Sequence, residues 1–269
     1  MKYSKLGQTE LLVSKIALGC ANLNVFDKTA TGKLIDYSLE RGINYFDTAS
    51  SYQAGYNEQF LGQMLRNKGN DIIMSTKIGY PTSIFGKSVN KLKSFANLDN
   101  HTQPSNSFLI KTLEKSLKNL RVDCIDLLFV HNPLPNKKLF EEFKGQLELF
   151  VKEGKIRYYG VSFMNLEDFF LSAEEQVCYQ IMQVPLNASS IHHLTHEKKT
   201  DLINSKTGII ARQPFAYLKQ ATGADYRKFS DSYESALGNL YNLQWVNSVV
   251  FGTSNLKHLQ NNINFLENQ

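Results

Sequence analysis

Short apolar runs alternate with longer segments of helical periodicity along most of the chain. The runs are rich in β-branched and aromatic residues, a composition typical of buried strands. Eight runs fit this description: residues 16–18, 45–47, 72–76, 125–130, 156–161, 179–183, 208–211 and 248–251. Eight strands that alternate with helices favour a (β/α)8 TIM barrel over a doubly wound sheet.

The segments between the runs carry apolar stripes at helical spacing, together with start and stop residues. A stripe of leucines follows Ser105, which is placed as an N-cap. Gly42 and Gly154 stand where two other helices should end. The segment 191–204 has weak periodicity, so its apolar spacing does not define the bounds of the helix expected after the sixth strand.

Residues 1–15 precede the first barrel strand. Their short alternation of apolar and polar residues around Gly7 predicts a β-hairpin that caps the bottom of the barrel. Two long connections, 79–103 and 215–230, each follow a strand. Because the carboxyl ends of barrel strands carry the active site, both connections should lie at the catalytic mouth.

Composition fits one globular domain that spans residues 1–269. Hydrophobic residues make up 42% of the chain and charged residues 20%, which is ordinary for a soluble protein. The net charge is +5 and the pI about 8.9. The lysines are scattered rather than clustered with aromatic residues, so we expect no nucleic-acid partner.

Cysteine usage and the amino terminus indicate the compartment. Cys20, Cys124 and Cys178 are odd in number and widely spaced, which argues against a disulfide framework and for a reducing environment. The amino terminus has no apolar signal region, and no run is long enough to span a membrane. We therefore expect a cytoplasmic protein with no membrane partner; the oligomeric state is open.

Four polar residues come at or just after the predicted strand ends. Asp47 ends the second strand with Tyr52 close behind it, Lys77 ends the third strand, and His131 ends the fourth. In a barrel these side chains would meet at one mouth. We expect Asp47 to hold the Lys77 ammonium, and the ammonium to lower the pKa of the Tyr52 phenol. A proton-donating phenol beside an imidazole suits carbonyl reduction.

At these positions the chain resembles an aldo-keto reductase. The family's signatures match here in the segment 42–49 with Tyr52, in 57–62, in 75–79 around Lys77, in 128–133 around His131, in 154–162, at Gln183, and in 252–254 with Asn262. The resemblance implies a (β/α)8 barrel and an extended NADPH, with NADH as the alternative. It also explains why no G-x-G-x-x-G fingerprint or Walker A lysine is present.

The resemblance further implies which residues would contact the cofactor. Ser162 and Gln183 would hold the nicotinamide carboxamide, and Asp47 belongs to the same region. Arg212 stands where many members stack an aromatic ring, and a guanidinium can also stack on a planar ring. The cofactor set is Gly19, Cys20, Asp47, Ser162, Gln183, Arg212, Gly252, Thr253, Ser254, His258 and Asn262.

This chain departs from the family pattern at several of those positions. Phe163 replaces an asparagine that often follows the serine of the fifth strand. Gly252 and His258 align with the cations that commonly hold the adenosine 2′-phosphate. Losing two cations weakens the case for strict NADPH preference, although Ser254, Asn255 and Lys257 could still serve a phosphate.

The expected function is reversible hydride transfer between a nicotinamide and a carbonyl of an aldehyde, ketone or sugar. Asp47, Tyr52, Lys77 and His131 would be catalytic, with Tyr52 as the general acid or base. The expected substrate contacts are Phe26, Tyr52, Tyr80, Phe85, His131, Asn132 and Phe163. The alternative is a nicotinamide-binding regulatory subunit that senses redox state without significant turnover, as some relatives do; a degraded tetrad would favour it.

Three histidines raise a metal hypothesis. His192 and His196 are four residues apart and would share one face of a helix, with His193 beside them. The glutamate of an H-E-x-x-H motif is missing between them. A polar loop that leads into a surface helix is the better interpretation, so we expect no metal.

Overall fold

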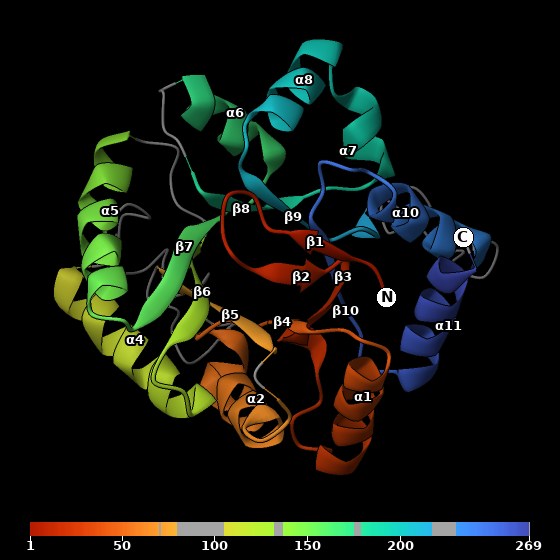
Figure 1. The fold of residues 1–269 in the computed structure, drawn as a ribbon, viewed down its shortest axis with the longest axis horizontal. Coiled ribbons are helices and arrows are strands. Elements are labelled where there is room, and N and C mark those ends of the chain that lie inside the picture. Colours follow the sequence, from red (N-terminus) through yellow and green to blue (C-terminus); the bar gives the residue numbers. More distant parts are fainter. Residues whose placement is uncertain (70, 80–104, 132–136, 175–178, 217–229, 269) are drawn as a thin grey trace, which may run out of the picture.

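The computed structural model describes residues 1–69, 71–79, 105–131, 137–174, 179–216 and 230–268. Within them eight parallel strands form a closed barrel in the order β10-β3-β4-β5-β6-β7-β8-β9, ringed by helices (Figure 1). The predicted TIM barrel is confirmed. The strands are β3 (Ile16–Gly19), β4 (Tyr45–Asp47), β5 (Ile73–Gly79), β6 (Ile125–His131), β7 (Ile156–Ser162), β8 (Ile181–Pro185), β9 (Gly208–Arg212) and β10 (Ser248–Gly252).

Most strands run further toward their carboxyl ends than their apolar residues indicated. β5 continues two residues past Lys77 to Gly79, and its last residue pairs with His131 of β6. His131 in turn pairs with Ser162 of β7, and Ser162 with Gln183 of β8. Polar residues at the ends of strands carry no hydrophobic signal, yet their backbone still joins the ladder. The register therefore places polar side chains next to one another around the mouth.

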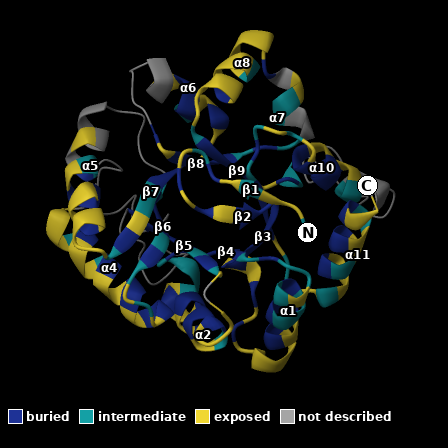
Figure 2. Ribbon diagram, in the orientation of Figure 1, coloured by how far each residue is buried: buried dark blue, intermediate teal, exposed yellow. Residues whose placement is uncertain are grey.

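The helices cover the outside of the barrel. Figure 2 shows the strands largely buried and the outward faces of the helices exposed. Among the described helices none is long and apolar enough to cross a membrane. They are α1 (Lys28–Glu40), α2 (Tyr56–Leu65), α4 (Asn106–Leu120), α5 (Lys137–Lys152), α6 (Leu166–Glu174), α7 (Ala188–His193), α8 (His196–Asn204), α10 (Ser230–Tyr241) and α11 (Leu256–Glu267), with 3₁₀ turns η1 (Cys20–Asn22) and η2 (Tyr52–Gly55).

The predicted helix signals act as expected where they were strong. The Ser105 side chain accepts a hydrogen bond from the backbone N–H of Phe108 at the start of α4. Gly42 and Gly154 follow α1 and α5 with positive φ angles of 79° and 69°, a conformation that costs glycine little. The two long connections fall almost entirely in 80–104 and 217–229, outside the described residues.

The weakly periodic segment after β8 forms two short helices instead of one. α7 ends at His193, Leu194 is extended, and Thr195 caps α8 by accepting a hydrogen bond from the backbone N–H of Lys198. His192 and His196 therefore lie on separate helices. The shared helix face that the metal hypothesis required is absent, because the N-cap threonine starts a new helix between them. Of the preferred interpretation, the surface helix is present as α8, but the segment before it is the short helix α7 rather than a loop.

The amino-terminal hairpin closes the bottom of the barrel, as predicted. β1 (Tyr3–Lys5) pairs antiparallel with β2 (Leu12–Ser14), and Leu6, Leu11 and Val13 join a buried cluster with the inner residues of the barrel strands. Gly7, with φ of 54°, lies so close to Gly208 that a Cβ on it would come within 2.4 Å of the Gly208 nitrogen. Gly208 begins β9, so the hairpin sits at the amino ends of the strands.

Candidate active site

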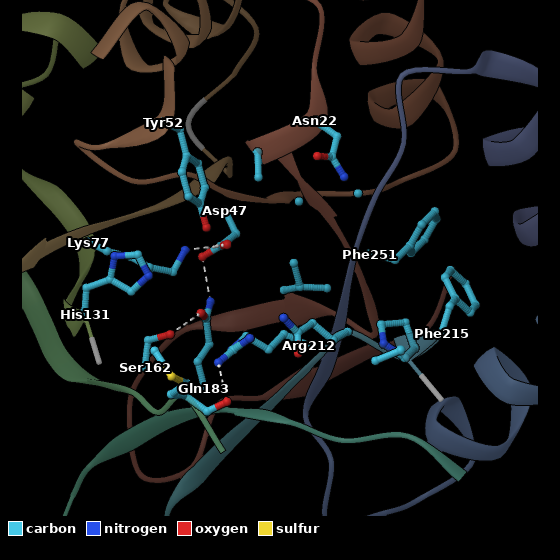
Figure 3. Close-up of a pocket in the computed structure, with 18 residues that line it drawn as sticks. Asn22, Asp47, Tyr52, Lys77, His131, Ser162, Gln183, Arg212, Phe215 and Phe251 are labelled. Atoms are coloured by element: carbon cyan, nitrogen blue, oxygen red, sulfur yellow. Dashed lines mark hydrogen bonds and ion pairs between the residues drawn. The ribbon is translucent and has the colours of Figure 1, made fainter. Parts of the chain in front are cut away.

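A cavity of about 730 Å³ opens at the carboxyl ends of the barrel strands. Asp47 is the last residue of β4 and His131 the last of β6, whereas Lys77 lies inside β5 and Tyr52 begins η2. All four side chains line the cavity (Figure 3). The structure thus brings together the four residues that were predicted to be catalytic.

Asp47 and Lys77 form a buried ion pair. The Lys77 Nζ donates to Asp47 Oδ2 at 2.6 Å and to the Thr48 carbonyl oxygen at 2.8 Å. Their side chains are 6% and 2% exposed. Two more donors, Ser75 Oγ and Gln183 Nε2, each reach Asp47 Oδ1 at 2.6 Å. The carboxylate thus accepts from three donors, which fix its position beside Lys77.

Tyr52 lies beside this pair, with the Lys77 Nζ 5.2 Å from the centre of its ring. The pKa of Tyr52 is raised above its ordinary value because burial disfavours the phenolate, and the Lys77 ammonium offsets only part of this rise. Lys77 thus lowers this pKa, as expected, but burial has the larger effect and the net shift is upward. The phenol stays protonated at neutral pH and is ready to donate.

His131 completes the group and lies beside both Tyr52 and Lys77 (Figure 3). The two rings meet edge to face, with centroids 6.4 Å apart and planes at 83°. Burial, followed by the charge of Lys77, lowers the pKa of His131 to about 4. The imidazole is therefore neutral near pH 7, so it offers one N–H donor and one acceptor nitrogen.

A closed ring of hydrogen bonds lies beneath the cavity floor, and the sequence analysis missed two of its members. Ser75 uses its only proton on Asp47, so the Tyr45 hydroxyl, 3.0 Å from Ser75 Oγ, must donate to it. Gln183 Nε2 closes the ring by reaching Asp47 Oδ1 and, at 3.4 Å, the Tyr45 oxygen. Tyr45 and Ser75 are fully buried. Their positions in the sequence could have revealed them. Tyr45 stands two residues before Asp47, and Ser75 two residues before Lys77, so each faces the same side of its strand as that catalytic candidate.

Ser162 and Gln183 are neighbours on β7 and β8. The Ser162 hydroxyl donates to Gln183 Oε1 at 3.1 Å, and both residues line the cavity. Because Gln183 Nε2 faces the Asp47 carboxylate, its amide orientation is fixed with the oxygen toward Ser162. These polar atoms suit a ligand amide.

Arg212 ends β9 and also lines the cavity. Its Nη2 donates to the carbonyl oxygens of Phe163 and Met164, the latter at 3.2 Å. Its Nε is buried and has no hydrogen-bond partner. Burial lowers the pKa of Arg212, yet a guanidinium remains charged at neutral pH.

Gly19 and Gly252 pair across β3 and β10 and widen one side of the mouth. A Cβ on Gly252 would lie 3.0 Å from the Gly19 oxygen, so a larger residue here would crowd the backbone of β3 at the edge of the cavity. Further along the chain, Thr253, Ser254 and His258 lie at or near the start of α11 and Asn262 is mostly buried within it. None of these four lines the cavity itself.

Three predicted contacts lie away from the cavity. Phe163 is fully buried and packs edge to face on Phe169 and Tyr179; Ser162 faces inward, so its neighbour Phe163 faces the helix layer. Cys20 is fully buried, with Sγ directed to the Leu18 carbonyl. Phe26 is 78% exposed and contacts Tyr56.

We therefore withdraw Phe163 and Phe26 as walls of the substrate pocket, and the Cys20 side chain as a cofactor contact. Of the remaining predicted substrate contacts, Tyr52 and His131 line the cavity, whereas Tyr80, Phe85 and Asn132 lie outside the described residues. Phe215 and Phe251, which were not predicted, do line the cavity.

Comparison with known proteins gives a consistent result. The model of the aldo/keto reductase family matches residues 15–235. Curated relatives include the uncharacterized oxidoreductase YqkF of Bacillus subtilis, 34% identical over 60% of this chain and 49% of its own length. Another is the aldo-keto reductase yakc [NADP(+)] of Schizosaccharomyces pombe, 30% identical over 56% of this chain and 42% of its own. These matches thus span about half the length of the relatives or less.

Solved structures share the fold. The holo form of the aldo-keto reductase AKR11C1 from Bacillus halodurans superposes with a TM-score of 0.76 at 24% identity, covering 99% of this chain and 91% of its own. A putative aldo-keto reductase from Pseudomonas aeruginosa gives a TM-score of 0.74 at 23% identity, with coverage of 99% and 94%.

Proposed function

The chain belongs to the aldo/keto reductase family, and from this premise we propose that it is an NAD(P)H-dependent oxidoreductase that interconverts a carbonyl group and an alcohol. The observation that carries the proposal is the tetrad. A protonated phenol, a buried ammonium–carboxylate pair and a neutral imidazole line one cavity. This set can deliver a proton to a carbonyl oxygen and stabilise the charge that develops there.

The residues around the tetrad fit a nicotinamide cofactor, which would supply or accept a hydride. Ser162 and Gln183 offer polar atoms for the carboxamide, and the bare backbone at Gly19 and Gly252 allows a ligand to approach closely. The cavity volume is within the range of cofactor sites. The adenosine end would continue to Thr253, Ser254 and His258, near the amino end of α11, where a helix terminus favours phosphate, and to Asn262 within that helix.

Tyr52 would give its proton to the substrate oxygen during reduction and take it back during oxidation. The Lys77 ammonium would stabilise the phenolate as it forms, because its charge already opposes the effect of burial on the pKa of Tyr52. Asp47 would keep Lys77 charged and in place. His131 would donate its single N–H to the same substrate oxygen and orient it.

We propose an aldehyde, ketone or sugar carbonyl as the substrate and NADPH as the cofactor, with NADH as the alternative. One relative is named as an NADP(+) enzyme, which supports the cofactor assignment. Apolar rings of Phe215 and Phe251 beside the polar tetrad suit a substrate with both polar and apolar parts.

The test compares wild type with Tyr52→Phe on a panel of aldehydes, ketones and sugars, following NADPH and NADH oxidation. We expect the variant to lose roughly 100-fold or more of turnover, while titration shows that cofactor Kd stays within about twofold. Tight cofactor binding without turnover on the panel would contradict the enzyme proposal and favour a redox-sensing regulatory subunit.

A further inference from the structure

Arg212 contributes a fixed positive charge to the cavity. Its guanidinium is tied to the carbonyl oxygens of Phe163 and Met164 at the end of β7. Figure 3 shows its side chain extending from β9 toward Gln183 and Ser162, across from Asp47 and Tyr52. Since the two carbonyls anchor it, the charge cannot move into solvent without breaking both contacts.

No carboxylate among the described residues forms an ion pair with Arg212. Asp47, which lines the same cavity, is already paired with Lys77 at 2.6 Å. His131 is neutral near pH 7 because its pKa is about 4. The described cavity lining therefore carries a net charge of about +1, and Arg212 is the group left without a counter-charge.

This charge acts at the reacting groups. It lowers the pKa values of both Tyr52 and His131, although other causes dominate each shift. Arg212 lines the same cavity as Tyr52 and His131, so a nicotinamide that meets a substrate held by Tyr52 would lie within its field. The oxidised nicotinamide ring carries a positive charge and the reduced ring carries none, so Arg212 acts differently on the two forms.

We propose that Arg212 disfavours the oxidised cofactor, so that at comparable concentrations of the two forms the site holds mainly the reduced one, the form that reduces a carbonyl. The inference rests on the proposed function. Two like charges that share one partly buried cavity repel enough to change an affinity by about tenfold or more. The repulsion would also speed release of the oxidised cofactor after reduction.

Calorimetric titration tests this with three ligands: NADPH, NADP⁺ and 2′-phospho-ADP-ribose, which lacks the nicotinamide ring. Wild type should bind NADPH about tenfold or more tightly than NADP⁺. Arg212→Gln should reduce this preference at least about fivefold, mainly by tightening NADP⁺. Arg212→Lys, which keeps the charge, should retain most of the preference, and 2′-phospho-ADP-ribose should bind all three proteins alike.

Each other outcome overturns the inference. An unchanged preference in Arg212→Gln would show that the charge does not act on the ring. Equal weakening of all three ligands would show that Arg212 binds the pyrophosphate instead. If wild type binds none of them, the proposed function itself fails, whereas binding without redox preference leaves the proposed function standing.

Discussion

Asp47 is held by more donors than its ion pair alone requires. Lys77 contacts one carboxylate oxygen, and Ser75 and Gln183 contact the other. Because Tyr45 donates to Ser75, the hydroxyl of Ser75 cannot turn away from Asp47. The buried ring therefore positions the carboxylate that holds Lys77 beside Tyr52. Tyr45 and Ser75 act through Asp47 and have no direct contact with the cavity.

Ser75→Ala removes one charge-assisted hydrogen bond from a buried carboxylate. We expect it to lower the free energy of unfolding by about 2 kcal/mol, measured by chemical denaturation. Ser116→Ala is the matched control, since the buried Ser116 hydroxyl on α4 has no hydrogen-bond partner. It should stay within about 0.5 kcal/mol of wild type or gain stability. Equal losses in both variants would show that the ring adds nothing beyond an ordinary buried serine.

His131 should make the protein less stable in acid. Its pKa is about 4 in the folded state against 6.5 for an unperturbed imidazole, so between these values the unfolded chain binds the proton more readily. Stability from this residue is present above pH 6.5 and falls as pH drops from 6.5 to 4, by roughly 3 kcal/mol in all.

Denaturation curves at several pH values measure this effect. In His131→Gln, the free energy of unfolding should no longer show the part of its fall between pH 6.5 and pH 4 that His131 causes. The control, His196→Gln, alters an exposed imidazole on α8 and leaves His131 in place, so it should still show that fall. A His131→Gln profile that parallels wild type would contradict the assignment.

At the scale of elements, periodicity predicted which strands exist but not where they end. Each strand of the barrel was recognised by its apolar residues, whereas Gly79, His131 and Ser162 lie beyond those residues and still pair in the sheet. Helix starts were predictable where one side chain caps them, as Ser105 does. The break at Thr195 was not predicted, because the apolar pattern is weak on both sides of it and does not show where one helix ends and the next begins.

The limits of sequence patterns also explain which residues of the site were predicted and which were missed. Asp47, Tyr52, Lys77 and His131 could be found because each stands at or just after the end of an apolar run within a recognisable local motif. The ring through Tyr45 and Ser75 depends on side chains from three strands, β4, β5 and β8, meeting inside the barrel. Phe163 was misassigned because its neighbour Ser162 faces inward and alternation turns Phe163 outward. Side-chain direction needs register, which sequence alone leaves open.

At the scale of the whole molecule, the candidate active site and the hairpin that closes the barrel lie at opposite ends of the strands. The cavity lies at the carboxyl ends, and the hairpin with Leu6, Leu11 and Val13 fills the amino ends. A seven-residue strand such as β5 separates them by about 20 Å. Substitutions at the two ends should therefore act independently, since distant sites with no shared partners are usually additive.

Gly7→Ala tests that independence. Its Cβ would strike the Gly208 backbone, and its φ of 54° disfavours alanine, so we expect a loss of roughly 2 kcal/mol in the free energy of unfolding. Gly145→Ala on α5 is the control: the residue is exposed, a Cβ there meets nothing within 4 Å, and helix propensity should add up to about 1 kcal/mol. NADPH at about 100 times its Kd should stabilise wild type and both variants by the same ~2.7 kcal/mol. If the increment shrinks in Gly7→Ala alone, then the hairpin also shapes the cavity, and the two ends of the barrel are coupled.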